Sequence, residues 1–555
     1  MNEYVTMARP WHGLYAQGVD PFFVPKPETV NDIFANATQT FADWVMIEYY
    51  GREFTYRQMR ALVAQAAAAL RAHGVQQGDR VALHLPNCPW HPIFFYGALH
   101  MGAVVTHLSP LDAERELQHK LSDSGARLVI SLSTPEFANR FKQLHADGTC
   151  PPVVLCPDPA SAAGRECPIP DGCTSVEDFW GDHAGAAFAP ADVSPDDLAL
   201  LQYTGGTTGL PKAAILTHFN LAATSQIYSE SSKLDSASAA GKAGLFYSPL
   251  FHIMGLSSGM LKRTREGGTM CLRLRFDAKS AVDEIEAKKI VSLGGVPTTW
   301  IAIMQLPDIG KRDLSSLEYV ASGGAPLPVE VYNRIKQLTG LKLRGGWGMT
   351  ETAPAGTLVP SGMPDDRLGT IGIPLPGLDM KIVDVDDPHR EMPAGEAGEM
   401  IIRGPNVTQG YWNKPDETAA SFVDGWFLTG DIGYMDAEGW FYIVDRKKDM
   451  ILSGGFNVYP LMIENAVHQH PDVAEAIAIG VPDDYRGESA KVFVVLNKGA
   501  EEFTLDQLQA FLADKLGRHE IPRHLEFRSE LPHTPVGKPW RRKLMEEEAQ
   551  ALERA

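Results

Sequence analysis

The chain has 555 residues, of which 44% are hydrophobic, and its formal net charge at pH 7 is −19. This length predicts roughly three to four domains or subdomains with substantial cores. The acidic balance argues against a general nucleic-acid binder, which would carry a basic surface, but it allows a local basic pocket for an anionic ligand.

The amino terminus and the apolar stretches bear on localisation. The sequence begins MNEYVTMARPW, which lacks the basic segment and following apolar segment of a signal peptide. The most apolar stretch, PIFFYGALHMGAVVTHL from Pro92, is interrupted by His and Gly, whereas a membrane span needs roughly 18 apolar residues. This stretch predicts a buried helix followed by a strand. We therefore expect a cytoplasmic protein without a transmembrane segment; peripheral membrane contact and a homodimer stay open.

Helical and strand patterns alternate from residue 52 onward. YRQMRALVAQAAAALRAHGV predicts an amphipathic helix that ends just before Gly74. DRVALHLP, GARLVISL and PPVVLCP are short apolar runs bounded by turn residues, as buried parallel strands are. This alternation predicts α/β layers, and the Pro-, Gly-, Ala- and Asp-rich residues 157–197 predict a long surface connection.

Cysteine is sparse, with six in the chain, as expected for a reducing compartment. Cys150, Cys156, Cys167 and Cys173 are separated by gaps of five, ten and five residues. Most zinc sites instead have closely spaced cysteine pairs. We favour ordinary loop thiols, with a metal site as the alternative.

The pattern changes near residue 369 and again near residue 449. GTIGIPLPGLDMKIVD, GEAGEMIIRGP and GWFYIVDR predict short strands with Gly-rich turns, hence a β-rich subdomain. After residue 449, PLMIENAVHQHP and TLDQLQAFLADKLG predict helices, and VAEAIAIGVP and AKVFVVLN predict strands. These last elements are enough for a compact α+β domain of about 100 residues.

The segment LQYTGGTTGLPKAAILTH, residues 201–218, combines glycines, threonines and one lysine. The backbone N–H groups of a Gly-rich turn can surround an anion, and a lysine adds a positive charge. The segment is not a Walker loop, because Leu210 and Pro211 separate Gly209 from Lys212 and no Ser or Thr follows the lysine. It predicts a phosphate-binding loop of another kind.

Six further motifs accompany this loop along the chain. They are YSPLFHIMG (247–255), ASGGAPL (321–327), GGWGMTET (345–352), DGWFLTGDIG (424–433), DRKKDMILSGGFNVYPLMIE (445–464) and LPHTPVGKPWRRK (531–543). In this order and spacing the seven motifs resemble the adenylate-forming superfamily of acyl-CoA synthetases, aryl-CoA ligases, luciferases and peptide-synthetase adenylation domains. The resemblance runs from REFTYRQM near residue 52 to about residue 543. The loop departs from the family signature at Gly205, where Ser is commoner, and at Ala213, where Gly is commoner.

The resemblance implies that ATP and Mg²⁺ bind to this chain. Thr204, Thr207, Thr208 and Lys212 would hold the β- and γ-phosphates. Thr350 would contact the α-phosphate, and Glu351 would help to hold Mg²⁺, which prefers oxygen ligands. Trp347 would stack on the adenine, and Asp431, assisted by Arg446, would accept hydrogen bonds from the ribose. The residues implied to surround the nucleotide are Thr204, Gly205, Gly206, Thr207, Thr208, Gly209, Lys212, Gly324, Ala325, Trp347, Asp431 and Arg446.

The resemblance also assigns residues to the acid and to the chemistry. His252 would lie beside the acyl carboxylate, although a His among apolar neighbours is more often a core residue. Lys538 would bridge the carboxylate and ATP during adenylation, acting with Thr350, Glu351 and His252 by positioning and preorganised charge. The implied substrate pocket consists of His252, Gly323, Gly345 and Gly346.

The implied fold class is α/β with two domains. Residues 1–447 would form a large amino-terminal domain of two layered α/β subdomains and a β-barrel-like one. Residues 448–555 would form a small, mobile α+β lid that rotates between the half-reactions about Lys448, since a charged, exposed residue suits a hinge.

The implied activity is acyl-CoA synthesis, in which an acid and ATP give an acyl-adenylate that CoA converts to acyl-CoA and AMP. Small residues at Gly323, Gly345 and Gly346 and the YTGGTTG variant favour a medium- or long-chain fatty acid, with an aromatic acid such as a cinnamate or benzoate as the alternative. Two other functions stay open: an adenylating enzyme that loads a separate carrier protein, and a non-catalytic relative. The latter would be expected to lack Lys212, Glu351 or Lys538.

Overall fold

The computed structural model describes residues 9–158, 168–183, 189–204, 211–232, 239–323, 329–453, 456–483, 485–533 and 540–554. It divides into two compact units. The larger unit comprises Trp11–Asp379 and Arg403–Phe422, and the smaller unit comprises Met1–Pro10, Met380–Ile402 and Val423–Ala555. The domain boundary at residues 447/448, inferred from the motifs, stays a prediction.

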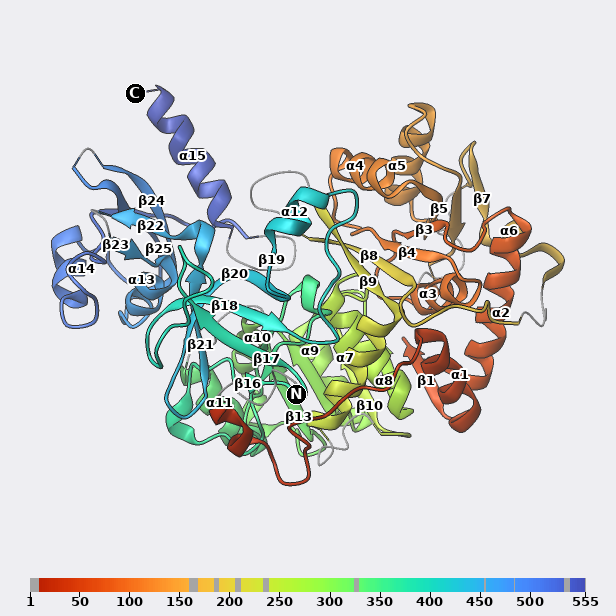
Figure 1. Cartoon of the computed structure of the whole chain (residues 1–555), viewed down its shortest axis with the longest axis horizontal. Coiled ribbons are helices and arrows are strands. Elements are labelled where there is room, and N and C mark those ends of the chain that lie inside the picture. Colours follow the sequence, from red (N-terminus) through yellow and green to blue (C-terminus); the bar gives the residue numbers. More distant parts are fainter. Residues whose placement is uncertain are drawn as a thin grey trace. The chain divides into compact units, whose positions relative to one another are not determined.

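A seven-stranded sheet forms the first layer of the larger unit (Figure 1). All of its strand pairs are parallel except β8–β9. The strand order is β7 (Cys173–Ser175), β6 (Val153–Cys156), β5 (Ala126–Leu132), β3 (Arg80–Leu83), β4 (Val104–His107), β8 (Leu198–Thr204) and β9 (Lys212–Thr217). The helices interleaved with these strands are α2 (Tyr56–Ala72), α3 (Trp90–His100), α4 (Glu114–Ser124), α5 (Pro135–Ala146) and α6 (Val176–Trp180).

The predicted helix and strands of this layer are confirmed, and their boundaries have local causes. Helix α2 begins after Thr55, whose hydroxyl accepts from the backbone N–H of Gln58 while the Gln58 side chain accepts from the Thr55 N–H. It ends before Gly74, whose φ of 81° favours glycine. Helix α3 is buried along nearly its whole length, as the apolar stretch from Pro92 predicts.

One prediction in this layer is wrong. Residues 157–197 are not only a surface connection, because they contain β7 and α6. Helix α6 buries Val176 and Phe179 in the core shared with α2 and α3. A three-residue strand and a five-residue helix are too short to give a recognisable periodicity.

A six-stranded sheet forms the second layer of the larger unit. Its strands pair in parallel except β1–β2. The order is β13 (Tyr319–Ser322), β12 (Ser292–Gly295), β10 (Ala243–Phe246), β11 (Thr269–Leu272), β1 (Val45–Tyr49) and β2 (Arg52–Thr55). The helices of this part are α1 (Val30–Thr40), α7 (His218–Ser231), α8 (Lys262–Glu266), α9 (Ala278–Lys288), α10 (Pro297–Met304) and α11 (Val329–Thr339). One continuous buried core includes residues of both layers, such as Val105 of β4 and Met270 of β11.

Short elements complete the larger unit. A three-stranded antiparallel sheet consists of β14 (Gly346–Trp347), β15 (Thr357–Leu358) and β16 (Ile373–Pro374). Helix α12 covers Pro415–Ala420. Among the described residues, no helix has the length and apolar character needed to cross a membrane.

The smaller unit contains two five-stranded sheets. The first consists of β17 (Asp379–Val383), β18 (Gly398–Arg403), β19 (Phe422–Val423), β20 (Trp426–Met435) and β21 (Phe441–Arg446). The second consists of β22 (Ile451–Ser453), β23 (Phe456–Val458), β24 (Val473–Asp483), β25 (Gly487–Leu496) and β26 (His524–Phe527), with helices α13 (Pro460–Val467), α14 (Leu505–Leu512) and α15 (Arg541–Arg554). These elements confirm the strands and helices predicted after residue 369.

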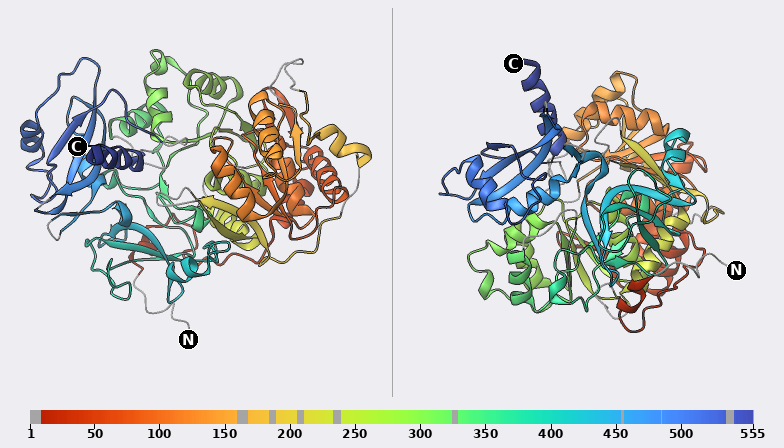
Figure 2. Two further views of the ribbon diagram at one scale, coloured as in Figure 1. Left: turned by 90° about the horizontal axis from the view of Figure 1, so that it is seen from above. Right: turned by 60° about the vertical axis from the view of Figure 1, so that its left-hand side comes forward.

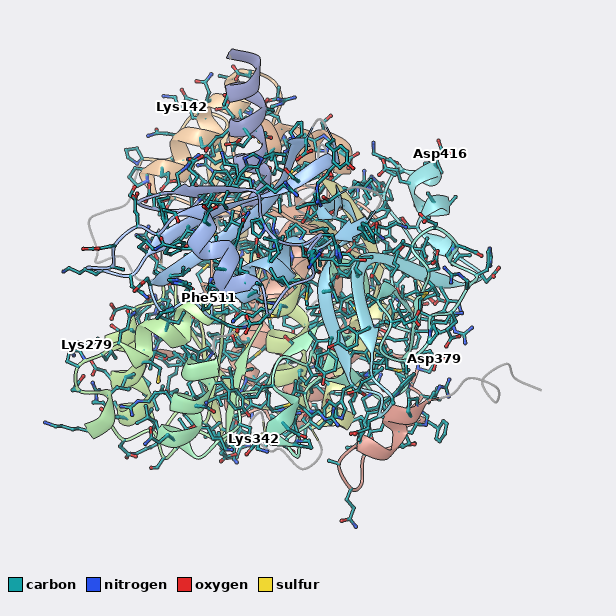
Figure 3. The ribbon with its side chains drawn as sticks, turned by 90° about the vertical axis from the view of Figure 1, so that its left-hand side faces the viewer. Lys142, Lys279, Lys342, Asp379, Asp416 and Phe511 are labelled. Atoms are coloured by element: carbon teal, nitrogen blue, oxygen red, sulfur yellow. The ribbon has the colours of Figure 1, made fainter. Side chains whose placement is uncertain are left out.

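Helices cover the second sheet of the smaller unit. Leu544 of α15 is fully buried with Ile477 and Ile479 of β24, and the helix is seen in Figure 2 leading to the carboxyl terminus. Phe511 of α14, labelled in Figure 3, packs against a second cluster on β24 and β25. The α+β domain predicted for this part therefore has cores of its own.

Candidate active site

The two ends of the Gly-rich loop lie side by side. Strand β8 ends at Thr204, β9 begins at Lys212, and these two residues are paired across the antiparallel ladder. The loop therefore connects the strands of a hairpin, unlike a Walker loop, which leads from a strand into a helix. Five of the predicted phosphate-binding residues lie between these ends and outside the described residues: Gly205, Gly206, Thr207, Thr208 and Gly209.

Helix α4 holds both ends of this loop. The Tyr203 hydroxyl donates to Asp123 Oδ2 over 2.7 Å, and His119 Nε2 lies 3.0 Å from the Pro211 carbonyl oxygen. Burial and the Asp123 carboxylate raise the pKa of Tyr203, so the phenol stays a donor at neutral pH. These contacts place Thr204 and Lys212 on a supported backbone.

Lys212 lies beside an aromatic ring and a carboxylate. Its Nζ is 4.8 Å from the ring centroid of Tyr411, and it forms an ion pair with Glu417 of α12. Asp416, the neighbour of Glu417, is labelled in Figure 3. The side chains of Lys212 and Glu417 are 37% and 41% exposed, so an incoming anion can reach the ammonium.

Glu351 contacts the same tyrosine. It lies in the short 3₁₀ helix η6 (Thr350–Thr352), is only 6% exposed, and its Oε1 accepts from the Tyr411 hydroxyl over 2.8 Å. Burial and this carboxylate raise the pKa of Tyr411. Residues 410–412 run beside β9, where the Trp412 N–H donates to the Ala213 carbonyl oxygen over 2.9 Å. The structure thus brings Lys212 and Glu351 together at Tyr411, and Thr350 directly precedes Glu351 in η6.

Tyr411 and Glu417 were missed by the sequence reasoning. They lie in GYWNKPDET, residues 410–418, between the motifs used for the prediction. A tyrosine flanked by Gly410 and Trp412 reads as an ordinary core aromatic, and only the pairing of this segment with β9 shows what it contacts.

Trp347 is part of β14 and is 8% exposed. Its backbone N–H donates to Thr357 Oγ1 over 3.1 Å. Gly356 lies against its indole, since a Cβ there would come within 2.4 Å of the ring. The residue before β15 (Thr357–Leu358) therefore packs against the indole, and the stacking of Trp347 on adenine stays a prediction.

His252 and Gly323 lie near a common neighbour. The His252 N–H donates to the Pro249 carbonyl oxygen over 3.1 Å, and His252 Nδ1 accepts from the Met254 N–H over 3.3 Å. A Cβ at Gly323 would lie 3.6 Å from the Met254 sulfur. These two of the four predicted acyl-pocket residues are thus close to Met254, which begins the π-helix η4 (Met254–Leu261).

The other two predicted pocket glycines lie close to backbone carbonyl oxygens. A Cβ at Gly346 would lie 2.4 Å from the Thr357 carbonyl oxygen, so the β14–β15 pair needs glycine there. A Cβ at Gly345 would lie 3.3 Å from the Ser322 carbonyl oxygen. Gly324 and Ala325 lie outside the part of the chain that the structure describes.

Asp431 and Arg446 face each other within the smaller unit. They are paired across β20 and β21, and Arg446 Nε is 2.6 Å from Asp431 Oδ1. The Asp431 side chain is fully buried. Lys448 is exposed in the short 3₁₀ helix η8 (Lys447–Asp449), and Lys538 lies outside the described residues.

Three of the four clustered cysteines lie in the first layer of the larger unit. Cys156 is buried, and Cys150 and Cys173 are half-buried against the core beneath α5. Burial raises the pKa of Cys150 to about 12 and also raises that of Cys156. Within the described ranges, no three metal-ligating side chains are grouped, and Cys167 is not among those residues.

Comparison with known proteins identifies the family. The family model described as AMP-binding enzyme matches residues 34–412, and that of the AMP-binding enzyme C-terminal domain matches residues 462–538. A long-chain-fatty-acid–CoA ligase of Bacillus subtilis (strain 168) is 37% identical over 561 residues, which cover 98% of each chain. A feruloyl-CoA synthase of an Amycolatopsis species is 36% identical over 495 residues, or 89% of this chain and 93% of that relative.

The solved structures agree with this assignment. ATP-bound MatB from Rhodopseudomonas palustris superposes with a TM-score of 0.83 at 30% identity, covering 94% of this chain and 99% of that one. The predicted fold class, ATP binding, CoA as co-substrate and the AMP-forming acid–thiol ligase class are confirmed. Because the first family model alone matches more than half of the residues, the chain belongs to the AMP-binding enzyme family.

Proposed function

We propose that the acid activated by this AMP-forming ligase is a medium- or long-chain fatty acid. The observation that carries the proposal is the match, over 98% of both chains, to a long-chain-fatty-acid–CoA ligase. The position of Gly323 supports it, because among the described residues, its chain neighbours aside, only the flexible Met254 side chain lies within 4 Å of the place where a Cβ would be. Methionine adapts readily to an apolar ligand such as an acyl chain.

The first half-reaction needs two anions to approach each other. A carboxylate oxygen of the acid attacks the α-phosphorus of ATP, and pyrophosphate leaves with the electron pair of the broken P–O bond. Lys212 and the loop threonines would neutralise the terminal phosphates, Thr350 would contact the α-phosphate, and His252 would lie at the carboxylate. Such preorganised charge stabilises the transition state without a covalent enzyme intermediate.

The residues around Glu351 fit a magnesium ion held together with the nucleotide. A buried carboxylate with a Thr hydroxyl next to it offers the oxygen donors that Mg²⁺ prefers, and Mg²⁺ is commonly bound by one or two carboxylates plus substrate phosphates. When bound, the ion would supply charge neutralisation for the triphosphate.

In the second half-reaction the CoA thiolate attacks the acyl carbonyl carbon and AMP leaves. Asp431, held by Arg446, would bind the ribose hydroxyls of the nucleotide. Lys538 would act only in the first half-reaction, and Lys448 would be the pivot of the lid. These assignments follow from the motifs TGD, DRKKD and TPVGKPW.

An aromatic acid is the second candidate substrate, because the feruloyl-CoA synthase is nearly as similar in sequence. The test is CoA-dependent AMP formation across a panel of saturated fatty acids of increasing length, benzoate, cinnamate and ferulate. The highest kcat/KM for a fatty acid of medium or long chain would support the proposal, and the highest kcat/KM for an aromatic acid would contradict it. Parallel assays with a holo-carrier protein in place of CoA test the carrier-loading alternative.

A further inference from the structure

The turn that carries His252 is held by two buried carboxamides from the other layer of the larger unit. Asn87 Oδ1 accepts from the Leu250 N–H over 2.8 Å, and Asn87 Nδ2 donates to the Ser248 carbonyl oxygen over 3.0 Å. Gln202 Nε2 donates to the Phe251 carbonyl oxygen over 3.0 Å. Asn87 and Gln202 are 4% and 6% exposed, so the groups they bind would lack water as a substitute partner.

The orientation of the Gln202 amide is set from both sides. Its Oε1 lies 2.8 Å from Nδ1 of His107. His107 is the residue of β4 that pairs with Gln202 across the parallel ladder. An amide oxygen only accepts, so His107 carries its hydrogen on Nδ1. The Phe251 carbonyl oxygen likewise only accepts, so the NH₂ group of Gln202 must face it.

A buried pair of imidazoles extends this chain of donors. His107 Nε2 is 3.2 Å from His91 Nε2, and both rings are buried. Burial lowers the pKa of His107 to about 4 and also lowers that of His91, so each neutral ring carries one hydrogen. Since the hydrogen of His107 is on Nδ1, His91 Nε2 donates to His107 Nε2. The direction of donation is therefore His91 to His107 to Gln202 to the Phe251 carbonyl.

Gln202 also belongs to the strand that leads into the phosphate loop. It precedes Thr204 by two residues on β8, and Phe251 directly precedes His252. A single side chain thus connects the strand that ends at the nucleotide loop with the turn that carries the acyl-site histidine. Adenylation requires the reacting atoms roughly 3–3.5 Å apart and aligned, and a displacement of about 1 Å can cost about a hundredfold in rate.

We propose that Gln202 is a positioning residue for adenylation: its amide donor holds the Phe251 carbonyl and so places His252 relative to the phosphate loop. The inference rests on the proposed role of His252 at the acyl carboxylate. The NH₂ group of Gln202 faces the turn because the Phe251 carbonyl oxygen can only accept, and His107 pairs with the other end of the same amide.

The experiment replaces Gln202 by glutamate, which has the same shape but presents an oxygen where the donor was. The matched control is Gln509→Glu, because Gln509 Nε2 donates to the Pro522 carbonyl oxygen over 2.7 Å within the smaller unit. Acid-dependent ATP–pyrophosphate exchange gives kcat and KM for the acid, calorimetry gives the Kd for ATP without acid, and thermal unfolding checks the fold. Activity of the unsubstituted enzyme is measured first, so a failure of the proposed function is seen separately.

The expected result for Gln202→Glu is a fall of about ten- to a hundredfold in kcat/KM for the acid, with the Kd for ATP within about twofold of its normal value. Gln509→Glu should leave both values unchanged. An unchanged kcat/KM for the acid, or equal losses for acid and ATP, would overturn the proposal. If the glutamate variant does not fold, Gln202→Met, which has a similar length and no charge, is measured in the same way. Failure of both variants to fold would make Gln202 a structural residue and also overturn the proposal.

Discussion

Replacing Glu351 by glutamine tests whether the nucleotide site depends on the charge of this buried carboxylate. Glutamine has the same shape and keeps an oxygen that can accept the hydrogen bond from Tyr411, which is 2.8 Å long in the structure. The backbone hydrogen bond from the Thr408 N–H to the Glu351 carbonyl oxygen, 2.7 Å, is unaffected by the change. We therefore expect the variant to fold and to lose only the negative charge.

The expected loss of activity follows from the burial of Glu351. A side chain that is 6% exposed acts where little water competes, so removing its charge removes a preorganised electrostatic contact. Such contacts are worth roughly 2.7–4 kcal/mol in the transition state, or about a hundred- to a thousandfold in rate. The stability cost should be smaller, about 1 kcal/mol, because a charged acceptor for the Tyr411 hydroxyl becomes a neutral one.

The assay is acid-dependent ATP–pyrophosphate exchange at increasing Mg²⁺ concentration, with thermal unfolding as the check on folding. The control is Tyr411→Phe, which removes the hydrogen bond to Glu351 and keeps the ring beside Lys212. Loss of the hydroxyl donor to the charged Glu351 should lower the free energy of unfolding by roughly 1.5–3 kcal/mol, but it should reduce exchange less than Glu351→Gln does, because the carboxylate charge remains. Normal exchange in a well-folded Glu351→Gln variant would remove Glu351 from the site, and equal losses in both variants would mean that the hydrogen bond, not the charge, is what matters.

Four further substitutions test the phosphate site, the acyl channel, the lid lysine and a buried carboxylate. Glu417→Gln removes the partly exposed ion pair with Lys212, so ATP should bind about two- to fivefold more tightly at low salt, as titration calorimetry would show; weaker binding would instead make Glu417 part of the site. Gly323→Leu should overfill the proposed acyl channel, at a cost of roughly 1–3 kcal/mol, and shift the chain-length profile toward shorter acids; an unchanged profile would place the channel elsewhere. Lys538→Ala should nearly abolish adenylation of the free acid yet still convert a supplied acyl-adenylate and CoA to acyl-CoA, whereas equal loss of both half-reactions would contradict the rotating lid. Burial raises the pKa of Glu464 from 4.5 to about 7, so its contribution to stability is full below pH 4.5 and is lost as the pH rises to about 7. Glu464→Gln should therefore make the free energy of urea unfolding less dependent on pH over that range. An unchanged pH dependence in this variant would contradict the raised pKa of Glu464.

Local patterns in the sequence were sufficient for most of the secondary structure. Helix α2 combines an apolar stripe, a capping box at Thr55 and a terminating glycine at Gly74, and all three signals indicate the same boundaries. The strands β3, β5 and β6 are apolar runs between turn residues, and the structure places them as neighbours in one sheet. By contrast, β7 and α6 are too short for any periodicity, so their burial depends on tertiary packing alone.

The nucleotide site could be predicted only where a motif contains it. Lys212 and Glu351 belong to motifs with recognisable residue types, and the structure places both against Tyr411. Tyr411 and Glu417 follow Lys212 by about two hundred residues and carry no local signal of their own. Their position depends on the pairing of residues 410–412 with β9, a long-range contact that one sequence does not reveal.

The hydroxyl and the ring face of Tyr411 contact two groups of opposite charge. Its hydroxyl donates to the carboxylate of Glu351, while the face of its ring attracts the ammonium of Lys212. The proposed chemistry needs both charges at once, since the carboxylate would bind the metal ion and the ammonium would bind the phosphates. Because Tyr411 is held by its backbone next to β9 and is only 9% exposed, neither contact requires the ring to move. A single rigid side chain can therefore position the Glu351 carboxylate and the Lys212 ammonium before the nucleotide binds. Charges that are already in place stabilise the transition state without reorganisation at the moment of reaction.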